Sequence, residues 1–186
     1  MSRALSIIGS ANKSTRPEHD FYPTPPQATE ALLRMECFNG SILEPACGDG
    51  AISKILVREF KKQHIVSCDL IDRGYGRSGS YDFLKCKERF DNIITNPPYK
   101  YATEFVKTAL DCSNNKIAML LKLQFLETVK RHELFKSSPL KIVYVFSKRL
   151  SLYRNGEQMK NSGMLCFAWF VWDKNFNGKP TVDWIL

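Results

Sequence analysis

The chain has 186 residues, with 27 lysine and arginine residues against 19 aspartate and glutamate residues, which gives a formal net charge of +8. A hydrophobic content of 44%, with 12% aromatic residues, excludes disorder of the whole chain because it supplies enough apolar surface for a packed core. The length fits one domain. The excess of positive charge favours an anionic partner such as nucleic acid, because contacts with phosphates release condensed counterions.

The cysteine and histidine content argues against several kinds of site. The six cysteines include no Cys-x-x-Cys pair, and only three histidines accompany them, so neither a zinc site nor a disulfide framework is expected. No stretch approaches the roughly 20 apolar residues of a membrane span, and no signal peptide is recognisable. We therefore expect a soluble cytoplasmic protein with buried thiols, no metal and no membrane contact, acting as a monomer or a homodimer.

The N-terminal region divides into an arm and a rigid segment. Residues 1–20 are polar and have no sustained period, which predicts a flexible arm before a single domain over 21–186. The prolines of Phe21–Pro26 favour extended backbone at the residue before each of them. A helix can begin only after this segment, and the spacing of apolar residues predicts one over 27–37.

Short strands and helices then alternate along the chain. This alternation implies an α/β fold with a mostly parallel sheet and helices on both faces. The last two strands are separated by a loop, which predicts a terminal antiparallel hairpin at one edge. Ligands of such sheets bind at the carboxyl ends of the strands. The predicted strands are 41–44, 65–68, 91–95, 116–123, 141–146 and 164–172, and the predicted helices are 51–60, 103–112 and 126–136.

The first strand ends in a glycine-containing turn, Glu44–Gly50 (EPACGDG), that opens a helix. Glycines allow a close approach of the backbone to a ligand. A dinucleotide site would need a glycine at Ser53, and the phosphate-binding Gly-Lys-Ser/Thr pattern is also absent. The acidic Glu44 and Asp49 favour a cationic, amino-bearing ligand such as S-adenosylmethionine. A plain strand-to-helix turn is the alternative.

Two further acidic positions follow the next strands. Asp69, with Leu70 beside it, ends the second strand about 20 residues after the glycines, where a nucleotide fold places the acid that binds ribose hydroxyls. Asp82 and Phe83 are placed to hold an adenine ring through its amino group and its edge. Either aspartate can instead be a strand-end or turn residue.

The sequence Asn96-Pro97-Pro98-Tyr99, directly after the 91–95 strand, is the most specific signal. The two prolines stiffen the loop and remove two backbone donors. An exocyclic base amine is a poor nucleophile, and two acceptors, the Asn96 side-chain oxygen and the Pro97 carbonyl, would favour its pyramidal form. Tyr99 would stack on the flipped base, a contact worth about 1–3 kcal/mol. The alternative is a proline turn in which Tyr99 only packs.

These motifs resemble those of class I S-adenosylmethionine-dependent amino-methyltransferases, and most closely the small phage- or prophage-type DNA adenine N6 methyltransferases. The resemblance covers about Phe21 to Trp172, in the gamma-like motif order. It implies a Rossmann-like class I methyltransferase fold, S-adenosyl-L-methionine as cofactor, DNA as partner, and catalysis by residues 96–99. The residues that it implies in cofactor binding are Phe21, Tyr22, Thr24, Pro25, Glu44, Pro45, Ala46, Gly48, Asp49, Gly50, Asp69, Leu70, Asp82, Phe83 and Asn96.

Larger family members have a separate target-recognition domain, for which this chain has no room. Recognition is therefore expected from an insert, 148–163, whose basic, aromatic and amide side chains suit phosphates and base edges. A solvated hairpin loop is the alternative, and the Arg73–Arg77 loop is a second candidate for recognition, which could instead line the cofactor. The helix that carries Lys130 and Arg131 is interpreted as a solvated face. The expected substrate-binding residues are Tyr99, Lys148, Arg149, Tyr153, Arg154, Asn155, Gln158 and Lys160.

Three other functions fit parts of the pattern. The same tetrapeptide occurs in enzymes that methylate adenine in RNA and in those that methylate a glutamine of release factors. The glycine-turn sequence and the N-terminal prolines favour DNA over these two. A non-catalytic nucleic-acid-binding module on a degenerate fold is the fourth possibility, and the complete set of motif residues disfavours it.

Overall fold

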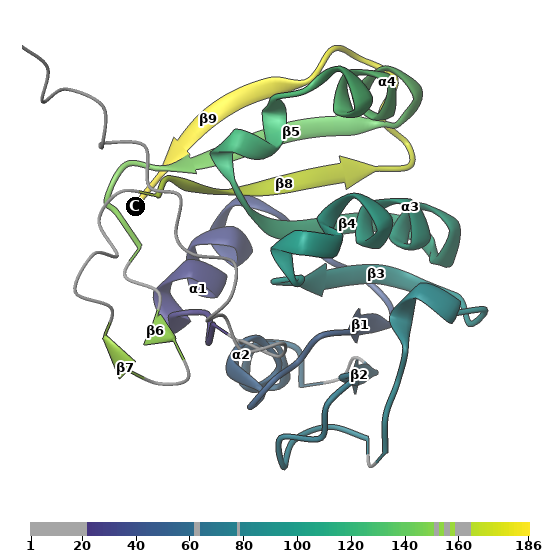
Figure 1. Ribbon diagram of the computed structural model, residues 1–186, viewed down its shortest axis with the longest axis vertical. Helices are drawn as coiled ribbons and strands as arrows, with labels where there is room; N and C mark the ends of the chain where they lie inside the picture. The colour runs from purple at the N-terminus through teal and green to yellow at the C-terminus, as the bar shows by residue number, and fades with distance from the viewer. Residues whose placement is uncertain (1–21, 62–63, 78, 151–152, 155–156, 159–164) are drawn as a thin grey trace, which may run out of the picture.

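The computed structural model describes residues 22–61, 64–77, 79–150, 153–154, 157–158 and 165–186, and of 153–154 and 157–158 it describes only the main chain. Its centre is a seven-stranded sheet in the order β2-β1-β3-β4-β8-β5-β9 (Figure 1). The strands are β1 Ile42–Glu44, β2 Ile65–Ser67, β3 Phe90–Thr95, β4 Ser113–Lys122, β5 Leu140–Phe146, β8 Phe167–Asp173 and β9 Thr181–Ile185. A separate pair, β6 Tyr153–Arg154 and β7 Glu157–Gln158, forms a two-stranded antiparallel ladder.

The sheet is mostly parallel, as predicted, with one antiparallel strand. β8 runs antiparallel to both of its neighbours, β4 and β5, and all other pairs are parallel. The position of β8 differs from the expected edge hairpin, because β8 lies inside the sheet and β9 forms the edge beside β5. Six consecutive buried residues of β8, from Phe167, fit an interior strand that is covered on both faces.

Helices cover both faces of the sheet, which confirms the predicted fold class. α1 (Pro26–Met35) and α2 (Ala51–Glu59) pack on one face, and α3 (Ala102–Cys112) and α4 (Val129–Ser137) pack on the other (Figure 1). Two apolar clusters correspond to the two faces. The Trp169 indole nitrogen of β8 donates a buried hydrogen bond of 2.8 Å to the Ala28 carbonyl, which fixes α1 against the centre of the sheet.

Three short 3-10 helices connect these elements, two of them at the carboxyl ends of β3 and β4. They are η1 (Phe83–Lys85) before β3, η2 (Tyr99–Tyr101) between β3 and α3, and η3 (Leu123–Leu126) between β4 and α4. The sequence did not predict these 3-10 helices, because segments of three or four residues are too short to produce a periodic pattern.

The outer edge of β2 is covered by an irregular segment and not by another strand. The Arg77 amide donates to the Ser67 carbonyl at 2.8 Å, and the Tyr81 amide donates to the Asp69 carbonyl at 2.8 Å. These two bonds occupy edge carbonyls that would otherwise be open to another chain. The segment also carries the chain back from the second strand to η1.

The described residues contain no helix with the length and apolarity needed to cross a membrane. Within the same residues, no three histidine, cysteine, aspartate or glutamate side chains are grouped so that they could hold a metal ion. The cysteines are free thiols: Cys47, Cys68 and Cys112 are buried, and Cys37 and Cys166 are exposed. Burial raises the pKa of the Cys47 and Cys112 thiols to about 12, so both are protonated and unreactive at neutral pH.

Candidate active site

The glycine turn joins β1 to α2 in a conformation that requires glycine. Gly48 and Gly50 have φ values of 55° and 82°, in the left-handed region. The Cys47 amide donates to the Cys68 carbonyl at 2.9 Å, and the Gly50 amide donates to the Cys47 carbonyl at 2.8 Å. The turn is therefore a tight loop fixed to the end of β2, with Pro45 buried and Ala46 partly buried at its start.

Glu44 lies beneath this turn and not on its surface. Its side chain is 1% exposed and accepts a hydrogen bond from the Ser53 hydroxyl, which in turn contacts the Ser67 hydroxyl. Burial, with smaller contributions from the charges of Asp69 and Asp49, raises the pKa of Glu44 well above its usual range. A direct ionic contact between Glu44 and a ligand is not available in this arrangement, so any attraction of a cation would act through its field.

Asp49 differs from Glu44 in position. Asp49 is only partly buried as a residue, but its Oδ1 atom is shielded from solvent and accepts no hydrogen bond from a described residue. A buried acceptor without a donor costs free energy unless a ligand or water supplies one. Asp49 is therefore a carboxylate in the turn with an unused acceptor.

Asp69 ties the end of β2 to the glycine turn. Its Oδ2 atom accepts from the Gly48 amide at 2.8 Å, and its Oδ1 atom accepts from the Ile71 amide at 2.9 Å. Each carboxylate oxygen keeps a second lone pair, so contact with ribose hydroxyls remains possible as predicted. Leu70 beside it is 49% exposed and offers an apolar surface at the same end of the sheet.

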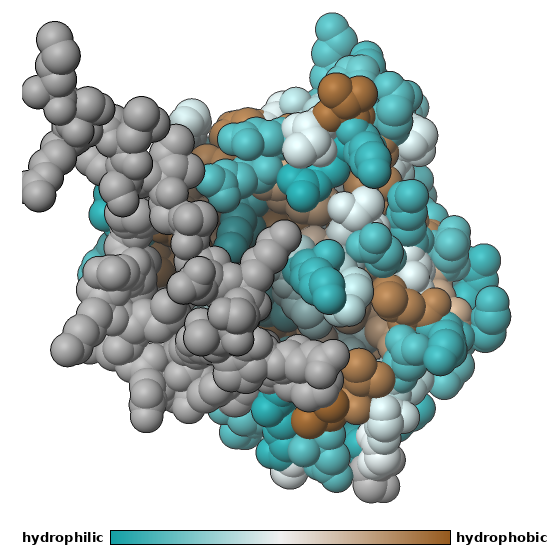
Figure 2. Space-filling model, viewed as in Figure 1, coloured by the Kyte–Doolittle hydropathy of each residue, from teal (hydrophilic) through white to brown (hydrophobic). Residues whose placement is uncertain are grey.

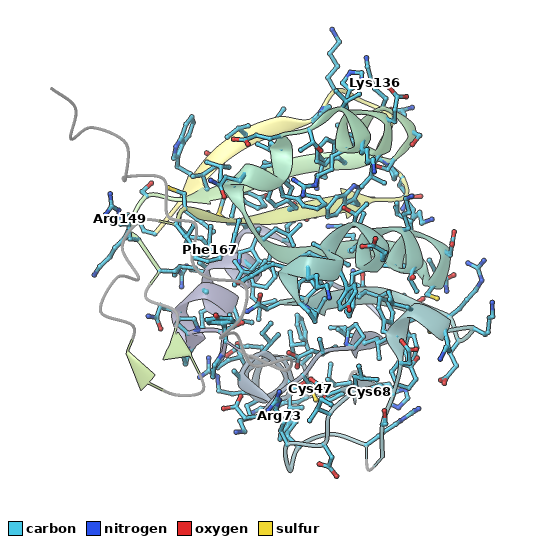
Figure 3. All side chains as sticks on the ribbon, in the orientation of Figure 1. Cys47, Cys68, Arg73, Lys136, Arg149 and Phe167 are labelled. Atoms are coloured by element: carbon cyan, nitrogen blue, oxygen red, sulfur yellow. The ribbon has the colours of Figure 1, made fainter. Side chains whose placement is uncertain are left out.

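The 73–77 loop covers the glycine turn. A Cβ atom added to Gly50 would lie 2.5 Å from the Tyr75 ring, so only glycine permits this close contact. The Cys47 thiol lies 3.6 Å from the Tyr75 carbonyl, and the Lys54 ammonium lies 5.3 Å from the centre of the Tyr75 ring. In Figure 3, Cys47 marks the turn and Arg73 marks the loop. The loop that the sequence suggested beside the cofactor is thus packed on the predicted cofactor turn.

The Asp82-Phe83 pair adopts the geometry of a capped turn. The Asp82 carboxylate accepts from the Leu84 amide at 3.1 Å and pairs with the Lys85 ammonium at 3.0 Å. The Phe83 ring is 2% exposed and packs in the core, 5.0 Å from the centre of the Phe105 ring. The predicted adenine contact would therefore depend on Asp82 and on the main chain rather than on the Phe83 ring.

Asn96 is oriented by the N-terminal proline segment. Its amide nitrogen donates to the Tyr22 carbonyl at 3.0 Å and to the Thr24 hydroxyl at 3.1 Å, across more than 70 positions of sequence. A backbone carbonyl has no proton to donate, so the nitrogen of the amide must face it. The Asn96 oxygen then faces the other way, and no described residue donates a hydrogen bond to it.

The rest of the tetrapeptide forms a stiff exit from β3. Pro97 is buried, and its carbonyl receives no hydrogen bond from a described residue, whereas the Pro98 carbonyl accepts from the Tyr101 amide at 2.9 Å and starts η2. Both oxygens that the sequence assigned to amine binding, those of Asn96 and Pro97, thus keep their lone pairs at the carboxyl end of β3.

Tyr99 lies in a group of side chains that the sequence only partly anticipated. Its ring centre is 6.3 Å from that of Tyr22 and 5.8 Å from that of Phe167, and the Lys122 ammonium lies 4.9 Å from it. The Tyr99 hydroxyl lies near the Asn96 amide without a hydrogen bond of good geometry, and burial raises its pKa. Lys122 and Phe167 are directly paired between β4 and β8, a register that no local pattern reveals.

The predicted recognition insert is only partly described. Phe21 of the proline segment and Asn155 and Lys160 of the insert lie outside the described residues, as does the 1–20 arm. Of Tyr153, Arg154 and Gln158, only the main chain of the β6–β7 pair is described. Lys148 and Arg149 are exposed, and Figure 3 shows Arg149 at the same end of the sheet as Phe167.

Comparison with known proteins gives a likeness of fold. No protein-family model matches the sequence, and no curated protein matches it. Among solved structures, a protein described as the modification subunit of a type I restriction enzyme from Vibrio vulnificus is similar over 92% of this chain and 46% of its own, with a TM-score of 0.63 and 16% identity. TrmN from Thermus thermophilus is similar over 80% of this chain and 48% of its own, with a TM-score of 0.56 and 18% identity.

A third similar structure is an S-adenosylmethionine-dependent O-methyltransferase from Thermotoga maritima, with a TM-score of 0.55, 10% identity, and coverage of 83% of this chain and 67% of that one. The fold is that of the Rossmann-like methyltransferases. A further similar structure, magnesium protoporphyrin IX methyltransferase from Synechocystis, contains bound S-adenosylmethionine, which agrees with the predicted cofactor. The chain spans about half the length of the first two proteins, so their activities and substrates do not transfer to it.

Proposed function

We propose that this protein transfers a methyl group from S-adenosylmethionine to the exocyclic amine of a nucleic-acid base, with adenine N6 in DNA as the substrate. The observation that carries the proposal is the fixed orientation of the Asn96 amide. Its nitrogen donates both of its hydrogen bonds to the N-terminal segment, and its oxygen can accept a hydrogen bond from a substrate. The adjacent Pro97 carbonyl supplies a second acceptor. An amine with two N–H groups suits such a pair of oxygens.

The residues of the glycine turn fit the proposed cofactor. When bound, S-adenosylmethionine supplies an electrophilic methyl group on a cationic sulfur. The turn offers the Asp49 carboxylate with its unused oxygen, and Asp69 stands next to it at the end of β2. These two carboxylates favour a ligand that is cationic and rich in donors.

The chain's part in the chemistry is to orient the amine. In a planar aromatic amine the nitrogen lone pair is delocalised into the ring. Hydrogen bonds to the oxygens of Asn96 and Pro97 would draw both protons out of the ring plane, so that the lone pair is less delocalised. The lone pair then points away from these oxygens. Once nitrogen has gained a methyl group it is cationic, and its proton is acidic enough to pass to solvent. No strong base is required among the side chains of the loop.

Three further features support a nucleic-acid substrate. The net charge is +8, and Lys122, Lys148 and Arg149 lie at or next to the carboxyl ends of β4 and β5. Tyr99, half-buried beside Phe167, offers an aromatic ring for a flipped base. Two structures that share the fold over most of this chain are a restriction-enzyme modification subunit and TrmN. The choice of DNA over RNA rests on the motif sequences at residues 22–26 and 44–50.

The test is nucleoside mass spectrometry of DNA and RNA from cells that express the wild type or Asn96→Ala. We expect N6-methyladenine in DNA from the wild type and a loss of about 100-fold or more in the variant, comparable with the loss of an electrostatic contact in other active sites. The exposed Asn177→Ala is the matched control and should behave as the wild type. Purified Asn96→Ala should still bind S-adenosylmethionine in calorimetry. Equal methylation by the wild type and Asn96→Ala would remove Asn96 from the chemistry.

The same experiment separates the other candidate functions. Methylated adenine in RNA alone would favour an RNA enzyme, and labelled cofactor with a release-factor substrate would reveal glutamine methylation. A protein that binds DNA but not S-adenosylmethionine would be the non-catalytic module.

A further inference from the structure

The end of β4 brings a lysine to the predicted base-binding loop. Lys122 is the last residue of β4 and is half-buried, and its ammonium lies 4.9 Å from the centre of the Tyr99 ring. No role was predicted for Lys122, because the 122–136 segment was interpreted as a solvated face. Its strand partner is Phe167, the second aromatic neighbour of Tyr99, so strand pairing fixes the Lys122 main chain relative to the proposed stacking surface.

Hydrogen bonds from Arg131 fix the conformation of the turn that follows Lys122. The Arg131 guanidinium donates to the carbonyls of Gln124 at 3.1 Å and Glu127 at 3.3 Å, and it lies 4.6 Å from the centre of the Phe125 ring. At the other end of the turn, the Leu123 amide donates to the Cys166 carbonyl at 2.8 Å. The Arg131 side chain thus contacts both η3 and the residue that follows it.

Thr128, which ends this turn, carries backbone strain. It has a φ of 88°, the only positive value among the described non-glycine residues, and a β-branched side chain disfavours this region strongly. Such strain persists only where surrounding contacts impose it, and it occurs preferentially at binding and catalytic sites. The strain and the Arg131 contacts together indicate that this turn, at the carboxyl end of the sheet, has a defined conformation of the kind found at binding sites.

An ammonium at this position suits a phosphate. A contact between a cation and an aromatic ring contributes about 0.5–2 kcal/mol, depending on how far it is desolvated, and an ammonium with three donors can still accept an anion as a further partner. A nucleotide whose base stacked on Tyr99 would carry its own phosphates within a few ångströms of that ring. Lysine is a mobile point charge on a four-carbon stem and can follow such a phosphate during base flipping. Figure 2 shows that the described surface in this view is mostly hydrophilic, with separate hydrophobic patches.

We propose that Lys122 binds the backbone phosphate of the target nucleotide and thereby positions its base on Tyr99. This inference rests on the proposed function and deepens it, because it makes a phosphate-bearing nucleotide, and not a free base or a glutamine side chain, the substrate. Lys122 is a positioning residue: it touches the substrate backbone, while Asn96 and Pro97 contact the amine. The η3 turn, through Arg131 and Thr128, holds the Lys122 end of β4 in place.

The test uses Lys122→Met, which keeps the apolar stem and removes the charge, and Lys122→Arg, which restores a cation. The control is Lys130→Met on the exposed face of α4, which changes the net charge equally. The substrate is whichever nucleic acid the wild type methylates, and its dissociation constant is measured by fluorescence polarisation over a range of salt concentrations with saturating S-adenosylmethionine.

For Lys122→Met we expect affinity to fall roughly tenfold, as for loss of one hydrogen bond to a charged group. The slope of log affinity against log salt should fall by about one, as for loss of one phosphate contact. Lys122→Arg should restore most of both quantities, and the dissociation constant for S-adenosylmethionine should not change. Lys130→Met should lower the affinity by a smaller factor than Lys122→Met does.

A Lys122→Met protein with wild-type affinity and wild-type salt slope would overturn the inference, even if its turnover or melting temperature changed, because the lysine would then only pack on Tyr99. This outcome leaves the proposed function intact as long as the wild type methylates nucleic acid and Asn96→Ala does not. A wild type that methylates no nucleic acid would instead refute the proposed function itself.

Discussion

The two halves of the candidate site are built in different ways. At the ends of β1 and β2, the glycine turn is fixed by main-chain bonds, such as those between Cys47 and Cys68, and by Asp69, about 20 residues away. At the ends of β3, β4 and β8, the site depends on side chains that are distant in sequence: Asn96 is held by Tyr22, and Tyr99 lies against Phe167. Substitutions in the first half should therefore damage the local backbone and stability, and those in the second should damage geometry and rate.

The largest effect is expected for Gly50→Ala in the first half. An L-residue in the left-handed region costs about 1–2 kcal/mol. The new Cβ would also meet the Tyr75 ring, and overpacking costs a further 1–3 kcal/mol or so. Urea unfolding should show a loss of about 2–5 kcal/mol, and S-adenosylmethionine binding should be lost.

A double variant separates these two causes. In the double variant Gly50→Ala/Tyr75→Ala, the steric cost of the new Cβ should disappear and the backbone cost should remain. Its free energy of unfolding should therefore lie between those of Gly50→Ala and Tyr75→Ala. The exposed Gly178→Ala is a poor control because its Cβ would meet Phe176, so Gly74→Ala, which has a similar φ of 80° and open space, is the better one. Equal stability of Gly50→Ala and Gly74→Ala would show that the Tyr75 contact is not tight.

The next effect is expected for Thr24→Val in the second half. Valine keeps the shape of this buried side chain but removes the hydroxyl that accepts from the Asn96 amide. The free energy of unfolding should fall by about 1 kcal/mol, the usual net value of one hydrogen bond. Methyl transfer should fall by roughly tenfold or more, because small misplacements of a catalytic group are costly.

Thr24→Ser provides the control, because it keeps the hydroxyl and loses only a methyl group. Single-turnover kinetics with saturating cofactor measure the effect on rate apart from binding. A Thr24→Val enzyme with normal single-turnover rates would mean that the Tyr22 carbonyl alone orients Asn96.

A pH effect is expected for Glu44→Gln. Burial raises the pKa of Glu44 in the folded state above that in the unfolded state, so its stabilising contribution is complete below the unfolded pKa of about 4.3 and is lost as pH rises through the folded pKa. A glutamine side chain can still accept a hydrogen bond from the Ser53 hydroxyl, but it does not titrate. The variant should therefore gain stability relative to the wild type as pH rises from 5 to 8.

Thermal unfolding of both proteins across this range measures the difference. Asp91→Asn provides a contrast, because hydrogen bonds from Ser41 lower the pKa of Asp91, and its contribution is instead lost in acid. A Glu44→Gln protein whose stability tracked the wild type at every pH would mean that Glu44 is not desolvated.

The smallest effect is expected for Tyr99→Phe. The hydroxyl is buried without a good hydrogen-bond partner among the described residues, so its removal should change the unfolding free energy by less than about 1 kcal/mol. The ring remains for stacking, and methylation should stay within a few-fold of the wild type. Tyr99→Ala, which removes the ring, should lose much more activity, and similar losses in both variants would assign a role to the hydroxyl.

Local patterns were sufficient to predict the elements and the turns of the first half. Helices were predicted over 51–60 and 103–112 and observed at Ala51–Glu59 and Ala102–Cys112, because apolar residues at helical spacing mark both. β9 was missed because four of its five residues are exposed, so no buried face leaves a pattern. The insertion of β8 between β4 and β5 was missed because strand order is a property of the whole sheet.

The candidate site follows the same division. The sequence predicted the oxygens of Asn96 and Pro97 but not the contact that orients Asn96, since the Tyr22 carbonyl is a main-chain atom without a side-chain signature. Lys122 and Phe167 were missed because each belongs to a different strand and they meet only through the β4–β8 register. Phe83, which was predicted to contact adenine, is 2% exposed, and local motifs do not reveal how far the core encloses such a ring.

The use of a backbone oxygen to orient Asn96 has a consequence for how the gene can change. Almost any residue at position 22 presents the same carbonyl, so drift at this codon leaves the link intact as long as the prolines around it keep the path of the chain. Position 96 has less freedom, because its donor is a side-chain amide, and aspartate, for example, lacks the amide protons. The two ends of one hydrogen bond therefore face very different mutational tolerance.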